Sequence, residues 1–224
     1  MRIAGILLIV GGLALSAGCT DEKSMNAMLP VGEAIYDLTF TATWSATTHP
    51  ENFPGNPHFS SLAGATHSAA VSFWSVGELA TTGIKNVAEG GNPGVLLDEV
   101  ADAIDAGTAE FSLLGGGIGT SPGTVSMAIA VNGDHPLVTL VSMIAPSPDW
   151  FVGVNGLNLG QNGAWIDSHT VDLFLYDAGT DDGEDYTSAN AVTDPPEPIA
   201  RIEGYPALVQ GEIRPVGTFT FVRR

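Results

Sequence analysis

The chain has 224 residues and a formal net charge of −18 at pH 7, from 7 basic and 25 acidic side chains. Nucleic acids and anionic membrane surfaces are bound through cationic patches, so this balance argues against both as partners and favours cations or basic ligands. The single cysteine excludes an internal disulfide, and 28 glycines with 14 prolines indicate strands and turns held together by core burial.

The start of the chain has the pattern of an export signal. Arg2 precedes an apolar stretch over residues 3–15, which is shorter than the roughly 20 residues that a membrane span needs. The segment Leu-Ser-Ala-Gly-Cys that ends at Cys19 resembles the lipobox of bacterial lipoproteins, in which the cysteine becomes the first mature residue and carries lipid. We therefore expect a signal peptide over residues 1–18 and a lipid anchor at Cys19, with plain secretion as the alternative.

Thr20, rather than an aspartate, follows that cysteine, which favours the outer membrane of a Gram-negative host, with the lipid as the only membrane contact. Residues 19–33 are polar and patternless and are predicted to form a tether. Residues 34–224 are predicted to form one domain. Its first element, from Ile35 to Trp44, alternates apolar and polar side chains and predicts a half-buried strand.

The next segments mix loops with short regular elements. Residues 47–61 are rich in proline, asparagine and glycine and predict a long loop, whose His49 and His58 are interpreted as surface histidines rather than metal ligands. We expect a strand over residues 69–76, followed by a helix over residues 81–89. Apolar residues at helical spacing behind Pro93 predict a second helix with a solvated acidic face formed by Asp98, Glu99, Asp102 and Asp105.

Gly119 to Gly123 spell Gly-x-Ser-x-Gly around Ser121, a pattern shared with hydrolases. The nucleophile elbow of those enzymes needs a strand before the serine and a helix after it. Here a glycine-rich connection, interpreted as a hairpin, precedes Ser121, while Pro122 and a predicted strand follow it. We interpret the match as coincidental.

The second half of the chain predicts several more strands. The apolar runs 124–131 and 137–145 flank an Asn-Gly pair at Asn132, a strong signal for a β-hairpin. Further strands are expected over residues 151–154, 170–176 and 216–222. About seven strands with little helix predict an all-β fold, an antiparallel β-sandwich with one or two short helices in its connections.

Three carboxylates stand in turn-rich loops at the ends of apolar runs: Asp149, Asp177 and Asp181. Loop carboxylates beside glycine and proline are ligands that a hard cation such as Ca²⁺ prefers. Like charges held this close would repel one another without a cation, so calcium binding should be coupled to loop order and stability. The loop is not an EF-hand, because Asp182 takes the place of the turn glycine.

Four segments resemble the spondin N-terminal domain, a family known from F-spondin-like extracellular matrix proteins and from bacterial exported proteins. They begin at Tyr36 (Tyr-Asp-Leu-Thr-Phe), Leu62 (Leu-Ala-Gly-Ala-Thr-His), Ser142 (through Ala-Pro-Ser-Pro-Asp-Trp) and Tyr176 (Tyr-Asp-Ala-Gly-Thr-Asp). The resemblance implies a C2-like β-sandwich with a calcium ion at one end, and the family's calcium carboxylates carry over to Asp149, Asp177 and Asp181. The cysteines that animal relatives carry after the Asp-Trp segment are absent here, so we expect no disulfide support. The thrombospondin repeats and other partner domains of the animal proteins are missing from this sequence too, so we do not expect their matrix-binding and guidance roles to transfer.

We therefore expect a non-catalytic, lipid-anchored, calcium-binding domain that binds an extracellular protein or glycan. Two alternatives stay open from the sequence alone. One is an exported hydrolase that uses Ser121 or the acidic loop around Asp149 and Glu184. The other is a purely structural protein of the cell envelope.

Overall fold

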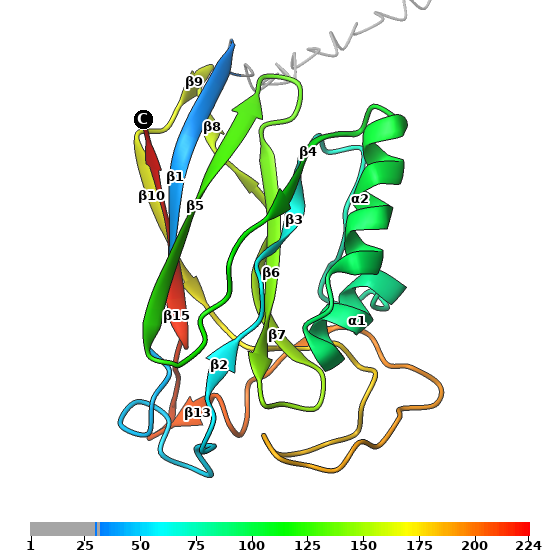
Figure 1. The fold of residues 1–224 in the computed structure, drawn as a ribbon, viewed down its shortest axis with the longest axis vertical. Helices are drawn as coiled ribbons and strands as arrows, with labels where there is room; N and C mark the ends of the chain where they lie inside the picture. The colour runs from blue at the N-terminus through cyan, green and yellow to red at the C-terminus, as the bar shows by residue number, and fades with distance from the viewer. Residues whose placement is uncertain (1–29, 31) are drawn as a thin grey trace, which may run out of the picture.

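A computed structural model describes residue 30 and residues 32–224, so the predicted signal peptide, Cys19 and most of the tether lie outside the described residues. Two antiparallel β-sheets pack face to face, and two helices cover the outer face of one sheet (Figure 1). The predicted antiparallel all-β sandwich with two short helices is confirmed. Among the described residues no helix is long and apolar enough to span a membrane.

The first sheet has four strands in the order β10-β15-β1-β5. Their bounds are Glu33–Ala42 for β1, Gly123–Asn132 for β5, Ser168–Leu173 for β10 and Gly217–Arg223 for β15. The alternation predicted for β1 is confirmed, because Tyr36, Leu38 and Phe40 are fully buried between the sheets whereas the residues between them are more exposed. Alternate residues of a strand point to opposite faces, which explains this pattern.

The second sheet runs β12-β11-β7-β6-β3-β4, and β2 also pairs with β6. Its strands are β2 (His58–Phe59), β3 (Ala63–His67), β4 (Ala109–Leu114), β6 (Leu137–Ala145), β7 (Trp150–Asn158), β11 (Tyr176–Asp177) and β12 (Ala200–Arg201). Two small hairpins complete the strands: β8 (Gly160–Gln161) with β9 (Ala164–Trp165), and β13 (Leu208–Val209) with β14 (Glu212–Ile213). The central strand β6 is almost wholly buried, as expected for a strand covered on both faces.

Helices α1 (Thr82–Gly90) and α2 (Gly94–Asp105) confirm the two predicted helices. The Thr81 side chain caps α1 by accepting a hydrogen bond from the Ile84 N–H, and Gly91 ends the helix with a left-handed φ of 65°. The acidic face predicted for α2 is only partly solvated. Glu99 accepts hydrogen bonds from the Thr81 hydroxyl (2.8 Å) and the Gly83 N–H (2.8 Å), so it joins the two helices.

Two apolar clusters hold the layers together. The larger cluster fills the space between the sheets and includes Trp44, Phe59 and Phe219. The smaller cluster lies between the second sheet and the helices and includes Ile84, Leu96 and other buried side chains: Phe73, Trp74, Val87, Val100, Phe151. Both clusters bury the apolar faces of the sheets, which is the main driving force for this fold.

Several local predictions were wrong. β5 and β6 flank the Asn132 turn but belong to different sheets, so they do not form a hairpin, and the glycine connection before Ser121 likewise joins strands of different sheets. Residues 69–76 are loop rather than strand. The single strand expected over residues 170–176 is split, because the chain leaves the first sheet after β10 and enters the second at β11. His49 is 1% exposed and is not a surface histidine.

Candidate metal centre

The candidate centre lies where β6 turns into β7 and where the chain leaves β11, at one end of the sandwich. Asp149 is the last residue of the β6–β7 loop. Ser147 closes that loop, because its hydroxyl donates to the Ile144 carbonyl (2.6 Å) and accepts from the Trp150 N–H (3.2 Å). The Asp149 carbonyl accepts a hydrogen bond from the Ala178 N–H (3.2 Å), which aligns the two segments. The fold therefore places Asp149 beside the turn that follows β11.

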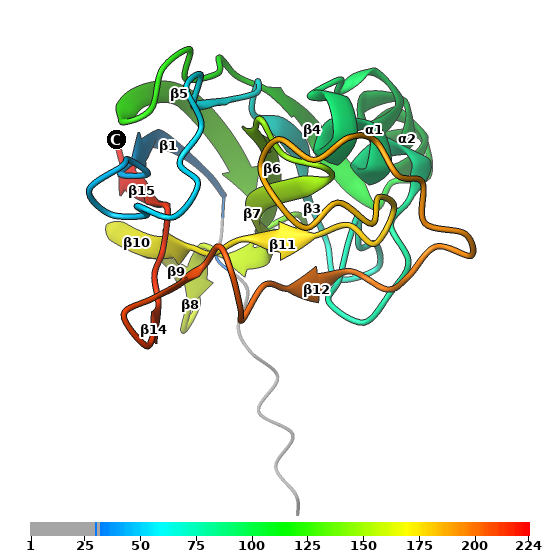
Figure 2. The same cartoon turned by 90° about the horizontal axis from the view of Figure 1, so that it is seen from below.

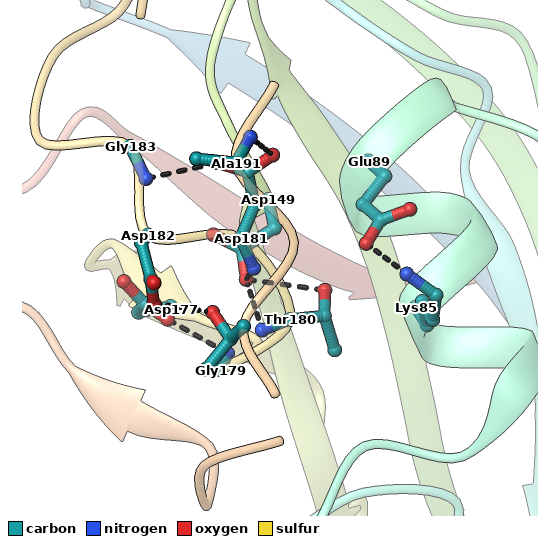
Figure 3. Close-up of polar contacts among 11 residues, drawn as sticks. Lys85, Glu89, Asp149, Asp177, Gly179, Thr180, Asp181, Asp182, Gly183 and Ala191 are labelled. Carbon is teal, nitrogen blue, oxygen red and sulfur yellow. Dashed lines mark hydrogen bonds and ion pairs between the residues drawn. The ribbon is translucent and has the colours of Figure 1, made fainter. Parts of the chain in front are cut away.

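Asp149 is completely buried, and its two carboxylate oxygens have unequal surroundings. Oδ2 accepts three hydrogen bonds, from the Thr180 N–H (2.7 Å), the Asp181 N–H (3.1 Å) and the Thr180 hydroxyl (3.2 Å) (Figure 3). Oδ1 is also buried but has no hydrogen-bond partner among the described residues. A buried carboxylate oxygen without a partner carries a large desolvation cost that a cation would remove.

The electrostatics of Asp149 reflect this position. Burial raises its pKa to about 6, and the negative charge of Asp177 contributes to the rise, whereas the N–H donors of Thr180 and Asp181 oppose it. Burial also raises the pKa of Asp177, with smaller contributions from Glu197 and Asp181, against the N–H of Gly179. The carboxylates thus destabilise one another's charged forms, which is the condition that a bound cation relieves.

The turn after β11 is held by its own aspartates. The Asp177 Oδ1 accepts from the Gly179 N–H (2.7 Å). Gly179 has a φ of 71°, and a Cβ atom there would lie 2.1 Å from the Glu197 carbonyl oxygen, so only glycine fits. Thr180 follows, and its N–H and hydroxyl both point to Asp149. The Asp-Ala-Gly-Thr-Asp sequence is therefore built to wrap this turn around the Asp149 carboxylate.

Asp181 pins the long loop that follows the turn. Its Oδ1 accepts from the Gly183 N–H (2.9 Å), and its Oδ2 accepts from the Ala191 N–H (3.0 Å). Asp181 is 5% exposed, so these bonds are shielded from water. Figure 3 shows this loop beside helix α1, on which Lys85 and Glu89 form an ion pair.

Next to these residues lies an acidic pocket of about 450 Å³. Its carboxylates are Asp177, Asp181, Asp182, Glu184 and Glu197, and Trp150 and Tyr205 form an aromatic wall. Within the described part of the chain no Lys, Arg or His lines it. Of these acids, Asp182 is exposed and accepts a hydrogen bond from the Thr193 hydroxyl (2.6 Å).

The three aspartates meet at one end of the fold but do not stand as ready metal ligands. Among residues 30 and 32–224, no three His, Cys, Asp or Glu side chains have an arrangement that could hold a metal ion. The oxygens of Asp181 bond to N–H groups of the loop. The residues nevertheless fit calcium in their chemistry, because the donors are hard carboxylate oxygens and Asp149 Oδ1 has no hydrogen-bond partner in the described part of the chain. Asp149, Asp177 and Asp181 would hold the ion, which would supply positive charge to this end of the sandwich.

Ser121 has none of the surroundings of a catalytic serine. It is 4% exposed, and its hydroxyl donates to the Trp44 carbonyl (2.8 Å). No hydrogen bond joins it to a His, Asp or Glu side chain in the part of the chain that the structure describes. A nucleophile needs an adjacent base and access to substrate, so the role of Ser121 here is to fix the β4–β5 connection.

Comparison with known proteins identifies the fold. The family model described as Spondin_N matches residues 34–207. The chain belongs to the spondin N-terminal domain family. Spondin-2 of Rattus norvegicus is 35% identical over 207 residues, covering 85% of this chain and 62% of that protein. Human Spondin-2 is 37% identical over 175 residues, covering 75% and 52%, and Spondin-1 of Gallus gallus is 34% identical over 190 residues, covering 82% and 24%. The chain thus spans between about a quarter and three fifths of these spondins.

Some residues of this spondin domain were missed by the sequence analysis. Thr180 supplies two of the three hydrogen bonds to Asp149, and Gly179 allows the turn its shape. The signal was present as an Asp-x-Gly pattern, in which the aspartate caps the N–H two residues later. The turn encloses Asp149 through a contact that spans 31 residues of the sequence, so no local pattern could have shown that the Thr180 N–H bonds to this carboxylate.

Proposed function

We propose that this spondin domain is a non-catalytic binding domain that acts outside the cytoplasm and is stabilised by one calcium ion. The observation that carries the proposal is the buried carboxylate of Asp149, which has three donors on one oxygen and no partner within the described residues on the other. Asp177 and Asp181 complete the calcium ligands. The ion would join the β6–β7 loop to the turn after β11 and so order the end of the sandwich.

The binding role is supported by membership of the spondin family and by the surroundings of Ser121, which do not favour a hydrolase. The ligand class proposed is an extracellular protein or glycan, because the net charge of −18 disfavours nucleic acid. We also propose that the protein is anchored to the outer membrane through lipid on Cys19. Labelling with radioactive palmitate should mark the wild type and not Cys19→Ala, and an unlabelled wild type would remove the anchor.

The calcium assignment is tested by thermal unfolding of the domain from Thr20 onward, in chelator and in a calcium titration. We expect the melting temperature of the wild type to rise with calcium and that of Asp149→Asn or Asp181→Asn to stay unchanged. A substitution of the surface residue Asp134→Asn serves as the matched control and should keep the rise. A wild type that does not respond to calcium would overturn the assignment.

A further inference from the structure

A second cleft, of about 430 Å³, opens on the side of the sandwich, and none of the described residues lines both this cleft and the acidic pocket. Its walls include Val171 and Asp172 of β10, Val154 and Leu157 of β7, and Trp74 and Val76 of the loop before α1; we call it the β10 cleft. The cleft lies at the boundary between the two sheets, where the chain runs from β10 in the first sheet to β11 in the second (Figure 2).

Strand β10 presents an unpaired edge to this cleft. Within the described residues it pairs only with β15, from Ser168 to Leu173 and without a register shift. The Asp167 and Leu173 carbonyls accept from N–H groups on the β15 side, so odd-numbered residues of β10 bond to β15. In an antiparallel ladder the alternate residues point the other way, and the N–H and C=O groups of Thr170 and Asp172 therefore face the open edge.

The facing strand β7 is a poorer edge. Only Trp150 and Phe151 pair with β11, so the rest of β7 is open on that side among the described residues. A register shift interrupts its ladder with β6, and Gly156 there has a φ of 58° and donates its N–H to the Thr139 hydroxyl (2.9 Å). Bulges of this kind bend a strand and prevent further pairing. Of the two open edges, β10 is the one that can accept another strand.

The two faces of β10 indicate which side chains an added strand should have on each of its faces. Val171 and Leu173 point inward and pack against the core between the sheets, whereas Thr170 and Asp172 are exposed on the outer face. Among the described residues, Asp172 is the only charged one that lines the cleft, and the other walls are largely apolar or aromatic. An added strand would meet apolar groups with one set of side chains and the Asp172 carboxylate with the other.

We propose that the β10 cleft binds an extended, basic segment of another protein, which adds to the first sheet as a strand beside β10, with apolar residues inward and Lys or Arg outward. This inference deepens the proposed binding role by giving its surface and the chemistry of its partner, and it does not depend on calcium. A second copy is disfavoured as the occupant, since each chain carries a net charge of −18 and the edge itself carries Asp172.

The test uses a fluorescent ten-residue peptide of alternating valine and lysine as the probe. The domain from Thr20 onward is titrated into the peptide in the presence of calcium, and binding is followed by fluorescence anisotropy. Thr170→Pro removes the one backbone N–H at this position, which points to the open edge, a change that edge strands tolerate; it also removes the side-chain hydrogen bond to the Thr220 hydroxyl (3.1 Å), as Thr170→Val does. Thr170→Val keeps that N–H and is the matched control. We expect Thr170→Pro to bind at least tenfold more weakly and Thr170→Val to bind as the wild type does, with melting temperatures confirming that both variants fold.

Two further peptides test the mode of binding. A peptide N-methylated at alternate nitrogens cannot pair as a strand and should lose binding at least tenfold, and a peptide with glutamate in place of lysine should bind as poorly. Equal binding by Thr170→Pro, or no binding by the wild type, would overturn the proposal. Concentration-dependent dimers that Thr170→Pro abolishes would overturn it in favour of a second copy. A calcium-stabilised domain that ignores the peptide would remove this proposal alone, whereas peptide binding without a calcium response would remove only the calcium site.

Discussion

The side chains of His67 and Asp149 are both buried and polar, but they differ in how completely they are hydrogen-bonded. His67, the last residue of β3, is 2% exposed, and both ring nitrogens have partners: Nδ1 with the Ser68 carbonyl (2.8 Å) and Nε2 with the Thr139 hydroxyl (2.8 Å). Asp149, at the end of the sandwich, is fully buried, yet its Oδ1 has no partner in the described part of the chain. A buried group with all its hydrogen bonds made stabilises a core, whereas a buried carboxylate oxygen without a partner favours the binding of a cation.

The same comparison separates their titrations. Burial lowers the pKa of the His67 imidazole, which keeps it neutral, and burial raises the pKa of Asp149. The neutral imidazole is fully hydrogen-bonded by the Ser68 carbonyl and the Thr139 hydroxyl. The ionised carboxylate needs a positive charge. We therefore expect perturbations at His67 to be independent of calcium and perturbations at Asp149 to depend on it.

The largest expected effect is that of His67→Ala. The substitution leaves a cavity beside Phe73 and removes the hydrogen bond between the imidazole and the Thr139 hydroxyl, and it should cost about 3 kcal/mol of unfolding free energy. Urea unfolding should give the same cost in chelator and in calcium. His169→Ala, at an exposed residue of β10, is the control and should change little. A cost at His67 that varied with calcium would erase the distinction from Asp149.

Asp149→Asn should show the opposite behaviour. Without calcium the neutral amide avoids an unpaired buried charge, so the variant should be at least as stable as the wild type. At calcium a hundredfold above the dissociation constant, the wild type should gain about 2.7 kcal/mol, and the variant should gain none. The same urea experiments measure both quantities. Equal stabilisation of the two proteins by calcium would contradict the role of Asp149.

The contributions of Asp149 and His67 to stability should depend on pH in opposite directions. Because the pKa of Asp149 is raised to about 6, its contribution to stability is present below the unfolded-state pKa and is lost as the pH rises through about 6. The pKa of His67 is lowered, so its contribution is present at neutral pH and lost on acidification. In chelator, the stability difference between wild type and Asp149→Asn should shift against the wild type by about 2 kcal/mol from pH 4 to pH 7. A difference that does not change with pH would be inconsistent with the buried carboxylate.

Ser121→Ala gives the smallest expected effect. It removes the hydrogen bond to the buried Trp44 carbonyl and should cost about 1 kcal/mol, irrespective of calcium. Its effect on calcium affinity should be nil. If the wild type hydrolysed an ester substrate and Ser121→Ala did not, the protein would be a hydrolase that uses Ser121, and the non-catalytic proposal would be overturned.

Much of the fold could be predicted because its strands and helices carry local periodicity. The alternation of β1 predicted which of its side chains are buried, and helical spacing behind Pro93 predicted α2. The errors in strand pairing share one cause, which is that no local pattern says which sheet a strand joins. The Asn132 turn has hairpin residues but carries the chain between sheets, and the residues that follow β10 change sheets within one apparent strand.

For the candidate site, the sequence indicated the residues but not their hydrogen bonds. Loop carboxylates beside glycine and proline, together with the family resemblance, indicated Asp149, Asp177 and Asp181, but they could not show that the Asp149 oxygens differ in their partners. That inequality comes from Thr180, whose N–H reaches Asp149 only because β11 pairs with the start of β7. His49 was misjudged for the same reason, since its burial depends on long-range packing that a loop-like sequence conceals.

The central claim is that calcium binds at Asp149, and terbium luminescence tests it most directly. Tb³⁺ takes the place of calcium, and the indole of Trp150, the next residue, can sensitise its emission. Excitation of the wild type should give terbium emission that calcium displaces, while Asp149→Asn should give at least tenfold weaker emission. Emission of equal strength from Asp149→Asn, or emission that calcium does not displace, would contradict the account.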